Sequence, residues 1–394
     1  MGPALLTIAL ACSGGSLSGP DQPDPPGPAA RLADCPSQIS QPLFTALPMD
    51  PADFIAFRPL GWLSPPTHVF PAKHHSFTMA LPGQPSPKKP VRAPGTIWVT
   101  EVWRIAFSSG GTNYQVYFQP CRQFRGYFFH LSSIAAKLES ALASSSPACD
   151  AFGDGIGGTI TRCRHQQLEV GLLAGEPLGI GTDAAGVDFG ATDQRAQPAG
   201  FIRPEHYPSD YGQYVSPVDY FSAEVKAALV ARLGSVFGTR PRTADPLVGS
   251  YMQDRAGTAQ GNWFRPGFYW NTGGDIAGAL ALVHDYVDPA QPVFSVGNSI
   301  PGLAMGLYSF VPRTAGRVNR NFGDVSADGS VFCYESFLSG QTAGGVGLGN
   351  PRGIVLIRLP TPTTLQVERQ GNDGTLCGDP ATWTFTAASV SFER

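Results

Sequence analysis

Short runs of β-branched and aromatic residues, separated by turn-forming residues, recur along most of the chain. Residues 96–107 and 114–118 are two such runs, and the Ser-Ser-Gly-Gly segment at 108–111 is typical of a turn between them. Residues 127–131 form a third run. Runs of the same character continue at 279–287, 293–296, 353–359, 364–369 and 383–392. The pattern predicts a mostly β protein whose C-terminal half is a sandwich or small barrel.

Helical periodicity is confined to two segments. In 132–144, Ser132 is placed to cap a helix, and apolar residues then recur at four-residue spacing. The segment 222–233 begins with Ser222 and carries Glu224 in its first turn. We therefore expect few helices, all of them short.

Composition agrees with this pattern and narrows the possible partners. The 47 Gly and 37 Pro residues make up roughly a fifth of the chain, a density that breaks helices and favours turns. Only 14% of the residues are charged and the formal net charge is −3, so the basic face that nucleic-acid binding requires is not expected. A length of 394 residues suits two domains, and the polar stretch 194–216 is the expected boundary between them. We place the domains at 41–200 and 201–394.

The N-terminus has the pattern of an export signal. The apolar run 4–11 is too short to span a bilayer, but it suits the hydrophobic region of a signal peptide. The sequence Ala9-Leu10-Ala11-Cys12 resembles a bacterial lipobox, which implies cleavage before Cys12 and a lipid on that residue. Residues 13–40 are then a flexible tether, because Gly, Ser, Pro and Asp dominate them and cannot pack a core. We expect a lipoprotein of the bacterial outer membrane, periplasm or cell surface, in which residues 1–12 are the signal peptide with its lipobox.

Six further cysteines suit an oxidising compartment and permit three disulfides in fifteen connectivities. We favour a bond between Cys149 and Cys163, because the Gly-rich stretch between them can close on itself. Cys333 and Cys377 would then pair in the C-terminal region. Cys35 and Cys121 remain, and their bond would tie the N-terminal arm to the first domain. No CxxC pair occurs, so a zinc ribbon is not expected.

Three fragments of the first half resemble a known family when they are taken together. They are PLGWLSPPTHVFPAKHHSF at 59–77, YFFHLSSI at 127–134 and EVGLLAGEPLGIGTDAAGVDFGATD at 169–193. Their order and spacing, with VRAPGTIWVTEV at 91–102, resemble the LytM-like M23 metallopeptidase domain, also called a duplicated hybrid motif. The resemblance implies a β-sheet domain over 41–200 and, in active relatives, a zinc site that cleaves peptide cross-links of peptidoglycan.

The ligands that this family uses are rearranged here. The family holds zinc through the His and Asp of an HxxxD motif and the second His of an HxH motif. Counting from His74 or His75, the Asp position holds Thr78 or Met79, and Asp188 stands where the family has its last zinc-binding His. His74, His75 and Asp188 are therefore the candidate ligands of a rearranged site. His130 matches the histidine of the "YAHL" segment, which the resemblance implies to be catalytic. His68, just before Phe70-Pro71-Ala72, is an alternative member of a site, but we favour its interpretation as a loop histidine.

The C-terminal half has weaker candidates. His284 with two nearby acids, and Arg317 with Arg320, have side chains suited to a metal, sugar or carboxylate ligand, but each set is also typical of turns and surface charge. The aromatic cluster at 263–270 suits either a core or an exposed platform for glycans, and we favour the core.

Three functions follow. The first is a non-catalytic LytM-like module, without a cofactor, that binds or scaffolds at the cell wall. The second is an atypical zinc endopeptidase that acts on peptidoglycan through the candidate ligands and His130. The third is a secreted carbohydrate-binding protein. The first two differ in geometry, because an enzyme needs its imidazoles and carboxylate within about 5 Å of one another around an open site.

Overall fold

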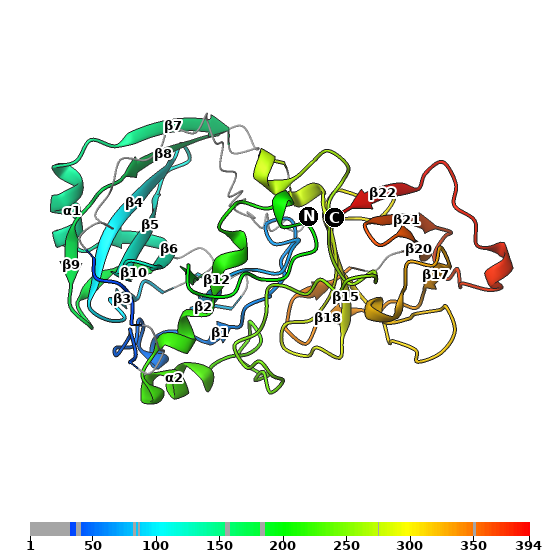
Figure 1. Ribbon diagram of the computed structural model, residues 1–394, viewed down its shortest axis with the longest axis horizontal. Helices are drawn as coiled ribbons and strands as arrows, with labels where there is room; N and C mark the ends of the chain where they lie inside the picture. Colours follow the sequence, from blue (N-terminus) through cyan, green and yellow to red (C-terminus); the bar gives the residue numbers. More distant parts are fainter. Residues whose placement is uncertain are drawn as a thin grey trace, which may run out of the picture.

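The computed structural model describes residues 32–36, 41–81, 84–85, 87–153, 158–181, 186–274, 276–349 and 352–394. The expected signal peptide, the lipidation residue Cys12 and most of the expected tether lie outside these ranges. Within them the protein is mostly β, as predicted, with a large curved sheet formed by the first half and two smaller sheets formed by the second (Figure 1). No helix in the described ranges is long and apolar enough to cross a bilayer.

The first half is built on a sheet of twelve strands, all paired antiparallel. The main path runs β1-β2-β11-β6-β5-β4-β8-β7. Its strands are β1 (Ala56–Arg58), β2 (His75–Thr78), β4 (Ile97–Phe107), β5 (Thr112–Cys121), β6 (Phe124–Ile134), β7 (Ala148–Gly153), β8 (Thr159–His165) and β11 (Val187–Asp193). Four further strands pair off this path, namely β3 (Pro90–Arg92), β9 (Val170–Leu172), β10 (Pro177–Gly181) and β12 (Tyr214–Val215).

One face of this sheet carries the apolar core. Val102, Val116 and Phe128 are fully buried there, and the ring of Phe128 stacks on Phe189 with 4.5 Å between the centroids. Both short helices contribute to the same core. Because side chains alternate along a strand, the residues between these core positions point to the opposite face. That opposite face holds the candidate site described below.

The two helices form near the predicted positions, with one correction. Helix α2 (Ala223–Val230) follows Ser222 directly, as predicted. Helix α1 (Ala136–Ala143) begins later than predicted, because strand β6 continues to Ile134 and includes Ser132. Pairing between β6 and β10 satisfies the backbone there, and the Ser132 hydroxyl donates to the Gly181 carbonyl at 3.1 Å instead of capping a helix. The residue that caps α1 is Ala135, without a side-chain bond.

All three predicted disulfides are present. Cys149 and Cys163 are directly opposite residues of β7 and β8, so their bond joins the two strands of an outer hairpin. Three disulfides are typical of exported proteins that fold in an oxidising compartment.

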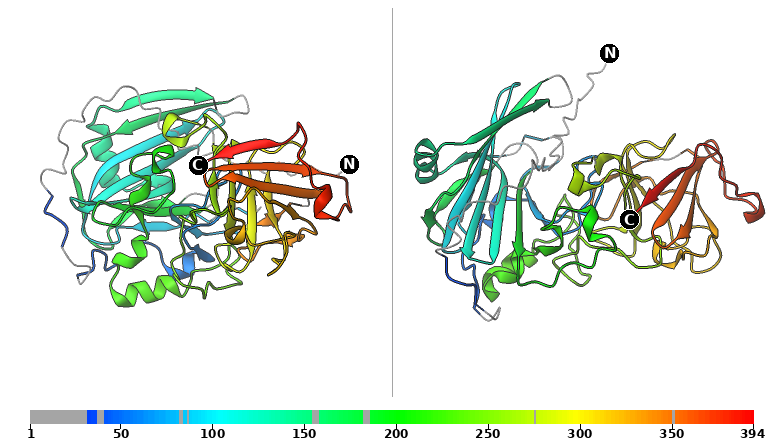
Figure 2. Two further views of the ribbon diagram at one scale, coloured as in Figure 1. Left: turned by 45° about the vertical axis from the view of Figure 1, so that its right-hand side comes forward. Right: turned by 45° about the horizontal axis from the view of Figure 1, so that its top comes forward.

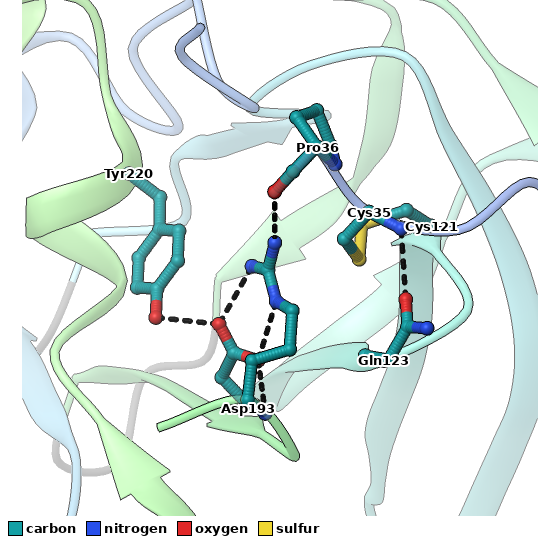
Figure 3. A network of polar contacts seen from close by, with 7 residues as sticks. Cys35, Pro36, Cys121, Gln123, Asp193 and Tyr220 are labelled. Atoms are coloured by element: carbon teal, nitrogen blue, oxygen red, sulfur yellow. Dashed lines mark hydrogen bonds and ion pairs between the residues drawn. A yellow bond between two sulfur atoms is a disulfide. The ribbon is translucent and has the colours of Figure 1, made fainter. Parts of the chain in front are cut away.

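The third of these bonds anchors the N-terminal arm to the sheet (Figure 3). Beside the Cys35–Cys121 bond, the Cys35 amide donates to the Gln123 side chain at 2.8 Å. The Pro36 carbonyl accepts from Arg195 at 2.6 Å, and the same arginine is paired with Asp193. The arm is thus held by covalent and polar contacts at once.

The second half contains two smaller sheets. One comprises β13 (Gly261–Trp263), β14 (Leu280–His284), β15 (Pro292–Val296), β16 (Gly306–Ser309), β18 (Gly340–Gln341) and β19 (Gly347–Leu348). The other comprises β17 (Val331–Tyr334), β20 (Ile354–Thr361), β21 (Thr364–Gln370) and β22 (Val390–Glu393). Their inner faces share one core, in which Phe294 meets Tyr334 with 5.0 Å between the ring centroids. The sheets therefore pack as a small sandwich, visible on the right of Figure 1.

Two predicted strands of this half are shorter than expected. Strand β14 stops at His284, because the Asp285 side chain accepts from the next backbone amides and turns the chain. Within 383–392 only the end is a strand, since Trp383 packs against the Cys333–Cys377 disulfide before β22 begins.

A third apolar cluster joins the two halves. It includes Phe70 from the loop before β2, Tyr211 from the segment just before β12, and Phe264 and Val283 from the second half. The views in Figure 2 show the small sheets lying beside the large one, with the segments around 200–280 between them. The loop that leads into β2 is therefore packed from both sides, which fixes the position of its histidines.

Candidate functional site

Three adjacent strands bring the candidate residues together. Asp188 on β11 is paired with Ser76 on β2 and with Phe129 on β6. Directly paired residues share one face of a sheet, so Asp188 lies on the face opposite the core. His74 immediately precedes β2, and His130 follows Phe129. Fragments that are far apart in the sequence thus meet at one carboxylate.

Asp188 lies between two imidazoles. Its Oδ1 is 3.6 Å from His74 Nδ1, and its Oδ2 is 3.1 Å from His130 Nε2. The residue is 6% exposed. Burial alone favours the neutral acid, but the imidazoles of His74 and His130 outweigh it and hold the pKa of Asp188 well below its usual range. Burial also lowers the pKa of His74, so at neutral pH we expect an ionised carboxylate beside a neutral His74 imidazole.

The backbone at His130 is unusual, and its ring is held on both sides. His130 has φ +67°, in the left-handed region that residues other than glycine seldom adopt. The Asn113 side-chain nitrogen lies 3.0 Å from Nδ1, so Nδ1 accepts and Nε2 donates to Asp188. The side-chain oxygen of Asn113 is buried without a partner. A strained backbone combined with an oriented imidazole is typical of functional sites.

His68 joins this cluster, which the sequence did not predict. Its ring centroid lies 5.2 Å from that of His74 and 4.0 Å from that of Trp62. Burial lowers the pKa of His68 well below its usual value, and neighbouring His74 adds to the effect. Among the described residues, no side chain or carbonyl forms a hydrogen bond with its ring nitrogens. The sequence feature that could have indicated this neighbour is the pair of histidines, His68 and His74, separated by five residues just before a strand.

His75 is not brought to the site, although it was a predicted ligand. It pairs with Phe189 on the core face, where its ring stacks on Phe57 at 4.8 Å. Its Nε2 lies 2.8 Å from the Ser216 hydroxyl, and its Nδ1 lies 3.0 Å from the Arg58 carbonyl. Burial lowers the pKa of His75 to about 3. Strand alternation therefore separates two consecutive histidines, one in the site and one in the core.

His68, His74 and Asp188 are residue types that bind zinc, and some of the distances between their side chains suit a zinc ion. Two ligand atoms of a tetrahedral zinc are about 3.3 Å apart, and two imidazoles on one zinc have ring centroids about 5 Å apart. The His68–His74 centroid distance of 5.2 Å is close to the second value. The 3.6 Å between His74 Nδ1 and Asp188 Oδ1 is close to the first, but Nδ1 also donates to the His75 carbonyl at 3.1 Å, so a metal would take His74 through Nε2. As the side chains lie, however, no three His, Cys, Asp or Glu residues of the described chain enclose one metal position, since Asp188 also contacts His130.

The candidates of the second half have structural partners. His284 Nε2 bonds Asn321 at 3.1 Å, and Asp285 accepts three backbone amides. Arg320 pairs with Asp324 at 3.2 Å, while Arg317 lies over the ring of Trp383.

The aromatic cluster at 263–270 is divided. Trp263 and Phe264 are core residues, as predicted, whereas Phe268 is 58% exposed. The apolar first part of the cluster is therefore no platform for a ligand.

Comparison of the chain with protein-family models, with curated proteins and with solved structures found no match.

Proposed function

We propose that the first half of the chain is a zinc-dependent hydrolase of the cell envelope that acts on peptide bonds of peptidoglycan. His68, His74 and Asp188 would hold the metal. The LytM resemblance suggests the substrate class, and the cluster of imidazoles around Asp188 is the observation that carries the proposal. The ligand types of the family are kept, two imidazoles and a carboxylate, but they are redistributed among the positions.

The residues around the metal position have separable roles. A zinc ion bound there would activate a water molecule and polarise the scissile carbonyl. Asp188 stays ionised next to the neutral His74, which is the charge state that metal ligation requires. His130 presents Nε2 to the carboxylate while Asn113 holds Nδ1, so the imidazole can pass a proton at Nε2 without rotating.

One contact favours a second candidate, a binding or scaffolding module without metal. The direct Asp188–His130 contact satisfies a buried carboxylate without any cation. In that case the same face would hold a cell-wall ligand and break no bond.

The zinc content of the purified chain distinguishes the hydrolase from the binding module without metal. The oxidised chain from 32 onward is incubated with zinc, freed of unbound metal and measured by atomic absorption, next to a His68→Ala, His74→Ala variant. His284→Ala is the matched control, because that histidine bonds Asn321 outside the site. The hydrolase predicts about one zinc per chain in parent and control and almost none in the double variant. Zinc-free parent protein contradicts the hydrolase and leaves the binding module.

The lipid anchor is a separate part of the proposal. We propose that Cys12 carries a lipid and that the chain faces an extracytoplasmic compartment. Three disulfides support the compartment. In bacteria that express the full chain, Cys12→Ser is expected to move the protein from the membrane fraction to the soluble fraction. An unchanged membrane fraction contradicts the anchor.

A further inference from the structure

Arg58 is a buried cation beside the histidine cluster. It is 8% exposed at the end of β1, and its Nη2 donates to the Ser76 hydroxyl at 2.9 Å. The guanidinium carbon lies 3.7 Å from the centroid of the Trp62 ring. Nε is buried and has no hydrogen-bond partner. Nη1 makes no hydrogen bond with any described residue.

The charge of this guanidinium is not neutralised by a direct partner. Among the described residues, no carboxylate forms an ion pair with it. Burial lowers the pKa of Arg58, and only more distant groups such as Tyr286 and Asp188 oppose the effect. An arginine nevertheless stays protonated in proteins, and a buried charge without a partner is costly. This cost indicates that a ligand supplies the partner that the guanidinium lacks.

The guanidinium and the histidines share one surface. Arg58 pairs with Ser76, and Ser76 pairs with Asp188, so the three residues form one row across β1, β2 and β11. Trp62 connects the row to the histidines, since its ring meets Arg58 on one side and His68 and His74 on others. An anion at Arg58 would therefore lie next to any group held at the cluster.

We propose that Arg58 binds a carboxylate of the ligand, so that this site takes peptides with a free carboxylate close to the group held at the histidines. The open donor is Nη1, which carries part of the guanidinium charge and would form a charge-assisted hydrogen bond with one oxygen of a carboxylate. Placing the carboxylate next to a bond to be cleaved rests on the proposed hydrolase. Carboxylate binding itself does not.

Charge balance supports an anion. Asp188 and Arg58 cancel when the neighbouring imidazoles are neutral. A divalent cation would raise the charge of the cluster to +2, which favours a negative ligand. Without the cation, Nη1 of the guanidinium still lacks a partner among the described residues.

The test compares two probes that differ in one charge. N-acetyl-alanyl-alanine and its C-terminal amide are titrated by calorimetry into the zinc-incubated parent chain. Charge-assisted hydrogen bonds predict that the acid binds at least about tenfold more tightly than the amide. Arg58→Met should reduce this ratio to within about twofold, and Arg58→Lys should retain part of it because the charge remains.

Arg125→Met is the matched control. Arg125 lies over Tyr117 in the same half but is already paired with Glu101, so its loss should leave the ratio unchanged. Thermal unfolding of each variant confirms that it is folded. Binding of neither probe, equal binding of both by the parent, or a preference that survives Arg58→Met overturns the inference. Displacement of the acid by equimolar inorganic phosphate shows a general anion site and also overturns it.

Zinc content, measured on the same samples, separates this inference from the proposed function. Bound zinc without acid preference refutes carboxylate binding alone. Acid preference without bound zinc refutes the hydrolase and leaves the carboxylate site intact.

Discussion

The two halves of the molecule bury polar side chains in opposite ways, and two arginines show the contrast. Arg394 in the second half is 1% exposed, lies over Trp263 and donates to the carbonyls of Gln260, Arg255 and Thr258. Arg58 in the first half also lies over a tryptophan but donates only to a serine hydroxyl. The same pairing of cation and indole is thus closed by three carbonyls in one half and left open at Nη1 in the other, while Nε is buried without a partner among the described residues in both.

Two buried carboxylates repeat the difference. Asp285 accepts from the backbone amides of Val287, Asp288 and Gly344, and its burial raises its pKa. Asp188 accepts from no backbone amide of the described ranges and faces two imidazoles. Polar side chains that bond the backbone hold loops in place. Polar side chains that face one another and keep unused lone pairs or N–H groups are suited to binding a ligand. The contrast supports the proposed ligand site in the first half.

The largest expected effect concerns the closed arginine. Arg394→Met removes a buried donor to three backbone carbonyls and should lower the free energy of unfolding of the second half by about 3–5 kcal/mol. Arg58→Met should cost less than about 1 kcal/mol, because a single hydroxyl loses its partner. Urea denaturation followed by tryptophan fluorescence measures both. Equal losses would end the distinction between closed and open arginines.

The second-largest effect is expected on zinc affinity, when the buried carboxylates of Asp188 and Asp285 are replaced in turn. Asp188→Asn keeps the shape of the side chain but removes the charge, and it should weaken zinc binding at least about a hundredfold, or about 2.7 kcal/mol. Asp285→Asn is the control and should leave zinc affinity unchanged. Competition with a chromophoric chelator gives both constants. Comparable zinc affinity in the two variants would show that Asp188 is not a ligand.

Lowering the pH should change the stability of the two halves against unfolding by different amounts. The pKa of His75 falls from its ordinary 6.5 to about 3 on folding, so its contribution is complete above pH 6.5 and is lost as the pH falls toward 3. Between pH 7 and pH 5 this costs the first half about 2 kcal/mol. In the second half, burial raises the pKa of Asp254 and Asp285, which stabilises the fold as these acids protonate, and it lowers the pKa of His206 and His284, which has the opposite effect. These opposed contributions should make the second half less sensitive to acid than the first.

Unfolding midpoints at pH 7 and pH 5 measure this difference, with fluorescence and circular dichroism to resolve two transitions. His75→Gln keeps hydrogen-bonding groups but cannot be protonated, and it should remove most of the acid sensitivity of the first half. A transition of the second half that is the more acid-sensitive of the two would reverse the assignment.

The smallest effect concerns Asn113, which acts through His130. Asn113→Ala should lower the rate of peptide hydrolysis about tenfold, because His130 loses the bond that orients it. Zinc content should stay the same. Asn262→Ala, at a buried amide of the second half that bonds Tyr207, is the control and should leave the rate unchanged. Loss of zinc with Asn113→Ala would instead mean that the residue holds the ligands in place.

The sequence was most informative where local pattern and tertiary pairing agree. The run 96–107 became β4, and 353–359 and 364–369 became β20 and β21, since their β-branched and aromatic residues fit a sheet wherever they pair. The helix predicted to begin at Ser132 failed at its start, because pairing with β10 extends β6 to Ile134. A cap signal is local, and a long-range strand pairing outweighs it.

The residues of the candidate site were likewise predicted only in part. His74, His130 and Asp188 were predicted from three separate fragments, and the structure brings them together. His75 was a wrong alternative because strand register, which the sequence does not contain, turns it to the core. His68 was missed because only the folded loop carries it back to His74.

The sequence by itself determined the mostly β character, a set of six cysteines that permits three disulfides, and the residue types available for chemistry. Those properties depend on composition and on short-range pattern. Only the tertiary structure decided which histidines share a site, that Arg58 is buried without a carboxylate, and that the acids of the second half are closed by backbone amides. These outcomes depend on distances between residues far apart in the chain, which strand register and loop packing set and local sequence does not.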